Sequence, residues 1–329
     1  MKLLIKCTIL AAAIIGVVLL SCKKNEEKQG KIVVLPTVIT DSIISIWPTA
    51  VDCKITVLTD SNSAVTDYGL CWSNKQNPTL ADNVMNTHYT VKGNVIIRAS
   101  NLKSNATYNI RGYATNSAGT AYGQQLTFTT TSATVTDYDG NVYKTVLIGN
   151  QLWLQKNLDV THYRNGDAIP NDTSPYVWDN TNSGGYCNYN NDTAMATKFG
   201  RLYNFYAVED SRNVCPVGWH VSTEDEWTAL VAYLGGPDVA GAAIKDTSQY
   251  ETSDEANNSS DFSALLGGMR QAIGFDNASF INGCGVWWTA SKSDSADAYG
   301  WNVDFGSSAI LGGAGPRLRD GYSVRCIRN

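Results

Sequence analysis

The stretch CPVGWHVSTEDEW, residues 215–227, decides the fold of the second half of the chain. It starts like a strand and becomes a helix after Thr223, whose hydroxyl can accept from the Glu226 amide while the Glu226 carboxylate reaches back, a capping box. Apolar residues then recur at helical spacing, at Trp227, Leu230, Val231 and Leu234. Gly235-Gly236-Pro237 ends the pattern. The stretch predicts a strand followed by a helix that packs one face on a core.

Patterns on both sides of this helix predict a small mixed α/β unit. Residues 137–154 resemble two strands joined through a Gly149-Asn150 turn, the pattern of a β-hairpin. The spacing of Phe199, Leu202, Tyr203 and Tyr206 predicts a helix before Cys215, and residues 238–246 a short helix after 237. Strands are predicted at 262–270, 286–291, 299–305 and 321–327. In residues 299–305, alternation puts Trp301 on one face and Asn302 and Asp304 on the other.

Four ordered motifs carry a family resemblance: FGRLYNFYAV at 199–208, CPVGWHVSTEDEWTALVAYLGG at 215–236, GVWWTAS at 285–291 and GYSVRCIRN at 321–329. They resemble the Fibrobacter succinogenes major paralogous domain (FISUMP) family, and the resemblance covers roughly residues 135–329. We assign the domain to residues 131–329. It implies a C-type-lectin-like α+β fold, which is also similar to the formylglycine-generating-enzyme domain. It implies no activity.

The resemblance also implies cysteine pairing. Lectin-like domains typically tie a cysteine beside the helix to one on the last strand, and Cys215 and Cys326 occupy those places. Cys187 and Cys284 are left as a second pair by default. Cys53 and Cys71 fall on predicted neighbouring strands of an earlier unit, where a disulfide and buried thiols are both compatible with the sequence; we favour buried thiols.

The N-terminus has the pattern of a lipoprotein signal peptide. Lys2 and Lys6 precede an apolar run, Ile9–Leu20, which is short for a transmembrane helix. Leu19-Leu20-Ser21-Cys22 then forms a lipobox, which predicts cleavage after residue 21 and lipidation of Cys22. Residues 22–30 are polar and predict a flexible tether. The expected location is the outer membrane, facing either the cell surface or the periplasm.

Residues 31–130 predict an all-β sandwich. Short alternating runs are separated by turn residues at the spacing of about seven strands. The run Leu102–Gly119 resembles the F strand and following turn of fibronectin type III domains, with Tyr108 as the corner tyrosine whose hydroxyl bonds back to the chain. We expect this unit to act as a spacer, and the Ser/Thr-rich residues 130–136 to mark the boundary with the second unit.

Residues 162–192 predict a long loop rich in Asn, Asp and Tyr, which is where binding sites often lie. Together with the strand residues above, the expected ligand-binding face comprises Trp178, Tyr189, Asn190, Asp192, Trp288, Asn302 and Asp304. Asn188, Asn190 and Asp192 offer oxygens two residues apart, as calcium ligands do, but turn capping explains them better. We expect no cofactor and no metal.

The overall sequence excludes some functions. With a net charge of −5 and no basic cluster after residue 30, nucleic acid is not an expected partner. His88, His162 and His220 are scattered and form no catalytic pattern, so we expect no enzyme. The expected function is a lipid-anchored binding or adhesion module for a glycan or a surface protein. The alternatives are a purely structural envelope component and, less favoured, an oxidase resembling formylglycine-generating enzymes.

Overall fold

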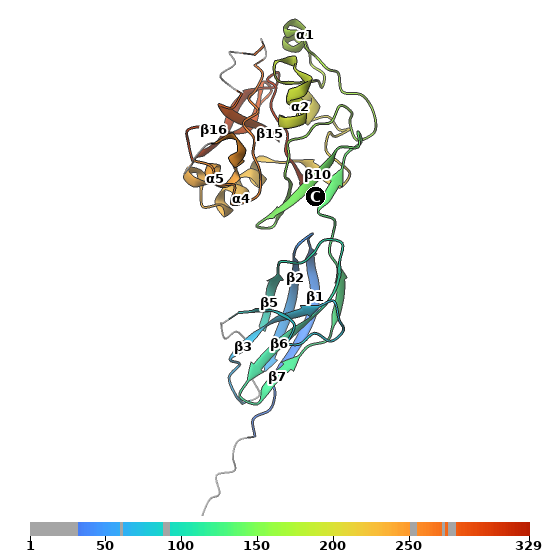
Figure 1. Ribbon diagram of the computed structural model, residues 1–329, viewed down its shortest axis with the longest axis vertical. Coiled ribbons are helices and arrows are strands. Elements are labelled where there is room, and N and C mark those ends of the chain that lie inside the picture. The colour runs from blue at the N-terminus through green and yellow to red at the C-terminus, as the bar shows by residue number, and fades with distance from the viewer. Residues whose placement is uncertain (1–31, 60–61, 88–92, 251–254, 272–273, 276–280) are drawn as a thin grey trace, which may run out of the picture.

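The computed structural model describes residues 32–59, 62–87, 93–250, 255–271, 274–275 and 281–329. Two units follow each other along the long axis (Figure 1). The first is a β-sandwich, and the second, which contains both helices and strands, is called the head. The predicted signal peptide, the lipidation residue Cys22 and the tether lie outside the described residues. In the part of the chain that is described, no helix is both long and apolar enough to cross a membrane.

The sandwich consists of two antiparallel sheets built from eight strands. One sheet has the order β1-β2-β5, with β1 at Thr37–Ile46, β2 at Val51–Thr59 and β5 at Gly93–Ala99. The other has the order β4-β3-β6-β7, and β8 also pairs with β6. Its strands are β3 (Asp67–Ser73), β4 (Asn83–Asn86), β6 (Thr107–Asn116), β7 (Gly119–Tyr122) and β8 (Leu126–Thr129). Alternating apolar residues of both sheets fill the space between them.

Two details of the sandwich agree with the predictions made from the sequence. The hydroxyl of Tyr108 accepts from the Lys103 amide at 3.1 Å, which is the corner expected at this position. Cys53 and Cys71 are buried thiols, as favoured. Their strands, β2 and β3, were expected to be neighbours but belong to different sheets. Burial raises the pKa of Cys53 to about 12 and that of Cys71 to about 11, so both act as small apolar side chains.

The head contains a five-stranded sheet of order β14-β18-β11-β10-β9 and a three-stranded sheet of order β15-β16-β17. The first comprises β9 (Thr134–Thr136), β10 (Val142–Ile148), β11 (Gln151–Leu154), β14 (Trp219–Val221) and β18 (Cys326–Arg328). The second comprises β15 (Cys284–Lys292), β16 (Asp297–Asp304) and β17 (Ile310–Arg317). β12 (Tyr186–Cys187) and β13 (Leu202–Tyr203) form a separate pair. The helices are α1 (Pro175–Asn180), α2 (Thr193–Phe199), α3 (Phe205–Val208), α4 (Glu224–Tyr233) and α5 (Pro237–Ile244), with 3₁₀ turns at Tyr189–Asn191 and Thr247–Gln249.

Helix α4 begins where the sequence predicts. Thr223 and Glu226 form the capping box, and the helix ends before Gly235 and Gly236, both at φ 101°. Its Trp227 is fully buried at the centre of an aromatic cluster. Ring centroids lie 5.3 Å away for Trp153, 5.6 Å for Phe262, 5.9 Å for Trp287 and 6.1 Å for Trp301. This cluster ties α4 to the hairpin and to the three-stranded sheet.

Three predicted elements differ from the structure. Residues 199–206 are not one helix, because Gly200, at φ 78°, ends α2 and the short strand β13 separates it from α3. Residues 262–270 form no strand, and their backbone pairs with other segments through isolated bridges, including that of Gly268 with Gly285. Residues 321–325 likewise pair singly, and only 326–328 form a strand. These segments are held mainly by side-chain packing and single bridges, which strand patterns do not reveal.

Arg325 is fully buried and is not paired with any carboxylate in the described structure. Its guanidinium donates to the carbonyls of Leu154 and Phe262, at 2.8 and 2.7 Å, and to Asn157 Oδ1 at 2.9 Å. Asn157 Oδ1 also accepts from Trp287 Nε1 at 2.8 Å, and its amide donates to the Phe199 carbonyl at 2.8 Å. Burial lowers the pKa of Arg325. The hydrogen bonds therefore offset a large desolvation cost.

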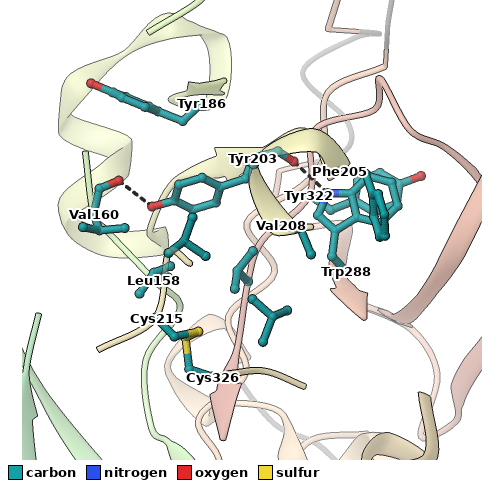
Figure 2. Packing of buried hydrophobic residues seen from close by; sticks show 14 of the residues in the cluster. Leu158, Val160, Tyr186, Tyr203, Phe205, Val208, Cys215, Trp288, Tyr322 and Cys326 are labelled. Atoms are coloured by element: carbon teal, nitrogen blue, oxygen red, sulfur yellow. Dashed lines mark hydrogen bonds between the residues drawn. A yellow bond between two sulfur atoms is a disulfide. The ribbon is translucent and has the colours of Figure 1, made fainter. Parts of the chain in front are cut away.

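The Cys215–Cys326 disulfide is confirmed, with an S–S distance of 2.01 Å and a Cα–Cα distance of 6.0 Å. It joins the segment before β14 to β18, and the two sulfurs lie within the larger apolar core (Figure 2). The bridge links residues 111 positions apart. A closed loop of that length removes much of the conformational freedom of the unfolded chain.

We expect reduction of this disulfide to lower the stability of the head by about 4–5 kcal/mol, because the unfolded chain regains that freedom. Thermal unfolding of the wild-type protein with and without a reductant measures the effect. A Cys215→Ala/Cys326→Ala variant is the control, since a reductant should not change its melting temperature. A wild-type melting temperature that is insensitive to reduction would contradict the prediction.

Two arginines join the units around Trp47. Arg328, on β18, donates to the Ile46 carbonyl at 3.1 Å, and its guanidinium lies 4.7 Å from the Trp47 ring centroid. Arg98, on β5, pairs with Asp52 at 2.7 Å and reaches across to Asn150 Oδ1 at 2.7 Å. The sequence analysis gave no role in the junction to either arginine. The sandwich is thus fixed to the base of the head, beside the end of the chain marked in Figure 1.

His220 forms a partly exposed ion pair beside the capping box. Its Nε2 lies 3.0 Å from Glu226 Oε1 and its Nδ1 lies 2.7 Å from Asn329 Oδ1. The hydrogen bond to Glu226 is the main cause that raises the pKa of His220. Burial raises the pKa of Glu226, but its bonds to His220 and Thr223 outweigh burial and leave that pKa lowered. The same carboxylate therefore serves the helix cap and the histidine.

The raised pKa of His220 predicts that the stability of the protein depends on pH. A histidine whose pKa is raised on folding stabilises the protein fully below its unfolded pKa of about 6.5 and loses that contribution as pH rises through the folded pKa. We expect the urea midpoint of the wild type to exceed that of His220→Gln at pH 6 by more than it does at pH 9. A difference that stays constant between these pH values would contradict this.

Candidate ligand-binding groove

The three-stranded sheet β15-β16-β17 divides the head into two environments. One face, which carries Trp287, Trp301 and Val303, packs into the aromatic cluster around α4. On the other face Asn302 of β16 lies opposite Val286 of β15 and Leu311 of β17. This second face forms the floor of an open groove.

The groove has a volume of about 490 Å³. Apolar side chains line most of it, and its floor is largely backbone because of its glycines. The lining residues are Met269, Cys284, Val286, Gly300, Trp301, Asn302, Asp304, Leu311, Gly312, Gly313, Ala314, Gly315, Pro316 and Tyr322. A concave, mostly apolar space of this size with few polar groups is the usual form of a ligand site.

Asn302 and Asp304 are the groove's polar side chains besides the tyrosine. Asn302 is half-buried and Asp304 exposed, and neither side chain takes part in a hydrogen bond or ion pair with another residue of the described chain. Among the described residues of the lining, Asp304 is also the only charged one. Its backbone carbonyl, by contrast, accepts from the buried Lys245 ammonium at 2.9 Å, which holds the end of β16 in place. The two side chains are therefore available to a ligand.

Tyr322, which lines one side of the groove, is held in place by stacking on Trp288. The Tyr322 ring stacks on Trp288 with centroids 4.4 Å apart, and Trp288 Nε1 donates to the Tyr203 carbonyl at 2.7 Å (Figure 2). Burial is the main cause that raises the pKa of Tyr322. The Tyr322 hydroxyl donates a hydrogen bond to Asp320 Oδ2 at 3.4 Å. Tyr322 thus presents a neutral, rigid ring edge to the groove.

Gly313 keeps the floor of the groove open. A Cβ placed on it would meet no atom within 4 Å. Gly306, in the turn after β16, is equally unobstructed but does not line the groove. Gly312, in contrast, lies against the Trp301 ring, where a Cβ would approach to 2.5 Å. Side chains can therefore be added at 313 to fill the groove without displacing the fold.

The structure brings together only part of the predicted ligand-binding face. Asn302 and Asp304 share the groove, whereas Trp178 and Trp288 are fully buried and Tyr189 is 3% exposed, so these three aromatics cannot form an exposed platform. Alternation in GVWWTAS predicts that Trp287 or Trp288 is near the surface, but β15 is covered on both faces. Trp178 lies beneath the Arg270 guanidinium, which is 4.3 Å from its ring centroid.

Asn190 and Asp192 are exposed but have local structural roles. Asn190 adopts a left-handed conformation at φ 52°, and Asp192 caps α2 by accepting from the Ala194 amide at 2.9 Å. The Asn188 side-chain oxygen accepts from Arg201 at 2.7 Å. The bond of Asp192 is turn capping of the kind that the sequence favoured for this run. Among the described residues, no group of three or more His, Cys, Asp or Glu is placed to hold a metal ion.

The prediction of a second disulfide, between Cys187 and Cys284, is wrong. Cys187 lies on β12 in a small cluster with Trp178, while Cys284 lies on β15 at the groove, and the two thiols do not bond to each other. Burial raises the pKa of each thiol to about 11. Pairing by elimination failed because both cysteines serve as small buried side chains.

The other groove residues were not predicted from the sequence. Tyr322 was assigned only to a buried strand, and residues 311–316 to no element. The run of small residues LGGAGP was a usable signal, because a strand without side chains next to a tryptophan-rich strand leaves space above the sheet.

Fold and site together define the class of the protein. It is a modular protein in which a fibronectin type III-like sandwich carries a disulfide-bonded head with a ligand-sized groove. The family model described as the Fibrobacter succinogenes major domain matches residues 146–328, and the chain belongs to this family.

Solved structures similar to the chain match about a third of it. The sensor domain of the anti-sigma factor RsgI4 in Pseudobacteroides cellulosolvens is 17% identical over 30% of this chain and 98% of its own, with a TM-score of 0.25. The chicken CNTN1 FN1-FN3 domains are 20% identical over 30% of this chain and 33% of theirs, with a TM-score of 0.24. A fibronectin type III domain of human KIAA0970 is 15% identical over 29% of this chain and 73% of its own, with a TM-score of 0.24. No curated protein matches the chain.

Proposed function

We propose that the protein is a lipid-anchored binding module of the cell envelope, with the groove of its head as the ligand site. The observation that carries the proposal is the pair of side chains, Asn302 and Asp304, with unused hydrogen-bonding groups in an otherwise apolar groove. Polar groups placed in this way orient a ligand, whereas a purely structural sheet face has no need of them. The ligand is a glycan or a segment of a surface protein.

Other features support an envelope location and a lectin-like head. The Cys215–Cys326 disulfide suits an oxidising compartment, and it joins the segment before β14 to the last strand, as in C-type-lectin-like domains. The sandwich holds the head through Trp47 and Arg328, in keeping with a spacer. We propose a binding rather than a catalytic role because His162 and His220 each pair with a carboxylate, Asp139 and Glu226. The hydroxyls beside them, those of Thr161 and Thr223, donate to the same carboxylates instead of to the histidines.

Filling the groove should abolish binding without unfolding the protein. We expect Gly313→Leu to lower affinity for the ligand by at least about tenfold, since the new side chain occupies the ligand's space. Binding to glycan arrays and to immobilised envelope proteins provides the measurement. Gly306→Leu is the matched control, because it adds the same side chain outside the groove. Equal binding by the two variants would show that the ligand lies elsewhere.

The lipid anchor is tested separately. We expect Cys22→Ala to abolish lipid attachment, because the acyl chains are carried by this cysteine. Metabolic labelling with a fatty-acid analogue, followed by fractionation, measures this. Protease treatment of intact wild-type cells then distinguishes a surface-exposed head, which is cleaved, from a periplasmic one, which is protected. Fatty-acid labelling of Cys22→Ala equal to that of the wild type would contradict the anchor.

A further inference from the structure

β17 is the edge strand of its sheet. It pairs with β16 on one side, and the sheet order β15-β16-β17 places no other described strand against it. Residues 311–315 are exposed, and in the part of the chain that is described their backbone groups make no hydrogen bond outside the sheet. One row of amides and carbonyls along this stretch is therefore available for pairing.

Edges of this kind are normally protected, and the described residues protect only the two ends of β17. Near Ile310 the strand is covered by α5, where the Ala242 amide donates to the Ser308 carbonyl at 2.9 Å. At the other end are Pro316, Arg317 and a register shift opposite Asp297–Tyr299. Between these ends, residues 311–315 have no charged side chain and no proline. An open, uncharged edge is a template for another strand.

The open edge and the groove belong to the same site. Residues 311–316 all line the groove, and Asn302 and Asp304 lie on the neighbouring strand. An extended ligand paired with β17 would direct alternate side chains toward the floor and walls. The apolar lining, including Met269, Val286 and Leu311, accepts aliphatic side chains. Asp304, which is the one charged side chain in the described part of the lining, accepts a cationic one.

We propose that the ligand of the groove is an extended peptide segment of a partner protein, which adds a strand to the edge of β17. The segment spans about five residues, or roughly 17 Å. It carries apolar side chains and one lysine or arginine that pairs with Asp304. This inference rests on the proposed function, because it names the ligand class of the same groove.

The test uses a phage-displayed library of linear dodecapeptides selected on the purified full chain, with counter-selection on Gly313→Leu. We expect the enriched peptides to share alternating apolar residues and one basic residue. Each is synthesised in three forms: unmodified, N-methylated on one set of alternate residues, and N-methylated on the other set. Methylating the set that pairs with β17 should lower affinity by about tenfold per amide, and methylating the other set should change it little.

The side-chain contact is tested on the protein. Asp304→Asn should lower affinity for the unmodified peptide by about tenfold, whereas Asp294→Asn, an exposed carboxylate in the β15–β16 turn, should not. Replacement of the peptide's basic residue by norleucine should lower affinity for the wild type but have little further effect on Asp304→Asn.

Other results would overturn the inference. Enriched peptides that bind equally well in both methylated forms would rule out strand addition. Glycans that bind the wild type and not Gly313→Leu, with no peptide doing so, would reject the peptide but keep the groove as a binding site. A dimer that Gly313→Leu dissociates would identify a second copy as the occupant. Failure of peptides and glycans alike, with a monomeric wild type, would reject the proposed function as well.

Discussion

A buried guanidinium without a carboxylate partner is the constraint on which the head depends. Arg325 is satisfied only when the hairpin, the 262–263 segment and Asn157 meet at one point. Asn157 also accepts from Trp287 and donates to the end of α2. A single side chain therefore fixes segments that have few strand bonds of their own. Leaving any one of these groups unsatisfied in the core costs about 1–3 kcal/mol, more if it is charged, so the packing around Arg325 is strongly specified.

The groove is a consequence of the same arrangement. The aromatic cluster around Trp227 and the hydrogen bonds of Asn157 hold one face of β15 and β16, and Trp288 with Tyr322 covers part of the other. Only the portion of that second face toward β17 is left open, where Gly300 and Gly313 provide no side chains. Asn302 and Asp304 then point from a rigid strand rather than from a loop. Rigid support of this kind reduces the entropy lost when a ligand is ordered.

Local signals predicted the parts of the fold that short-range chemistry determines. The capping box at Thr223, the hairpin at Gly149-Asn150 and the corner at Tyr108 each depend on residues close in sequence. The Cys215–Cys326 pair followed from the family resemblance. Asn302 and Asp304 were predicted from alternation, but Trp178, Tyr189 and Trp288 were misplaced because exposure depends on what covers both faces of an element. The groove itself depends on long-range packing of residues 269, 311–316 and 322, of which only the small-residue run at 311–316 gave a local signal.

The position of β18 has a consequence for the order in which the two units fold. β18 lies between β14 and β11, and it carries both the disulfide partner of Cys215 and the arginine that contacts Trp47. The five-stranded sheet of the head cannot form until residues 326–328 have been synthesised and have reached their place between β14 and β11. The sandwich, complete at Thr129, has no such requirement. We infer sequential maturation: the spacer becomes native while the head is still an open chain, and the docking of the two units is the last step.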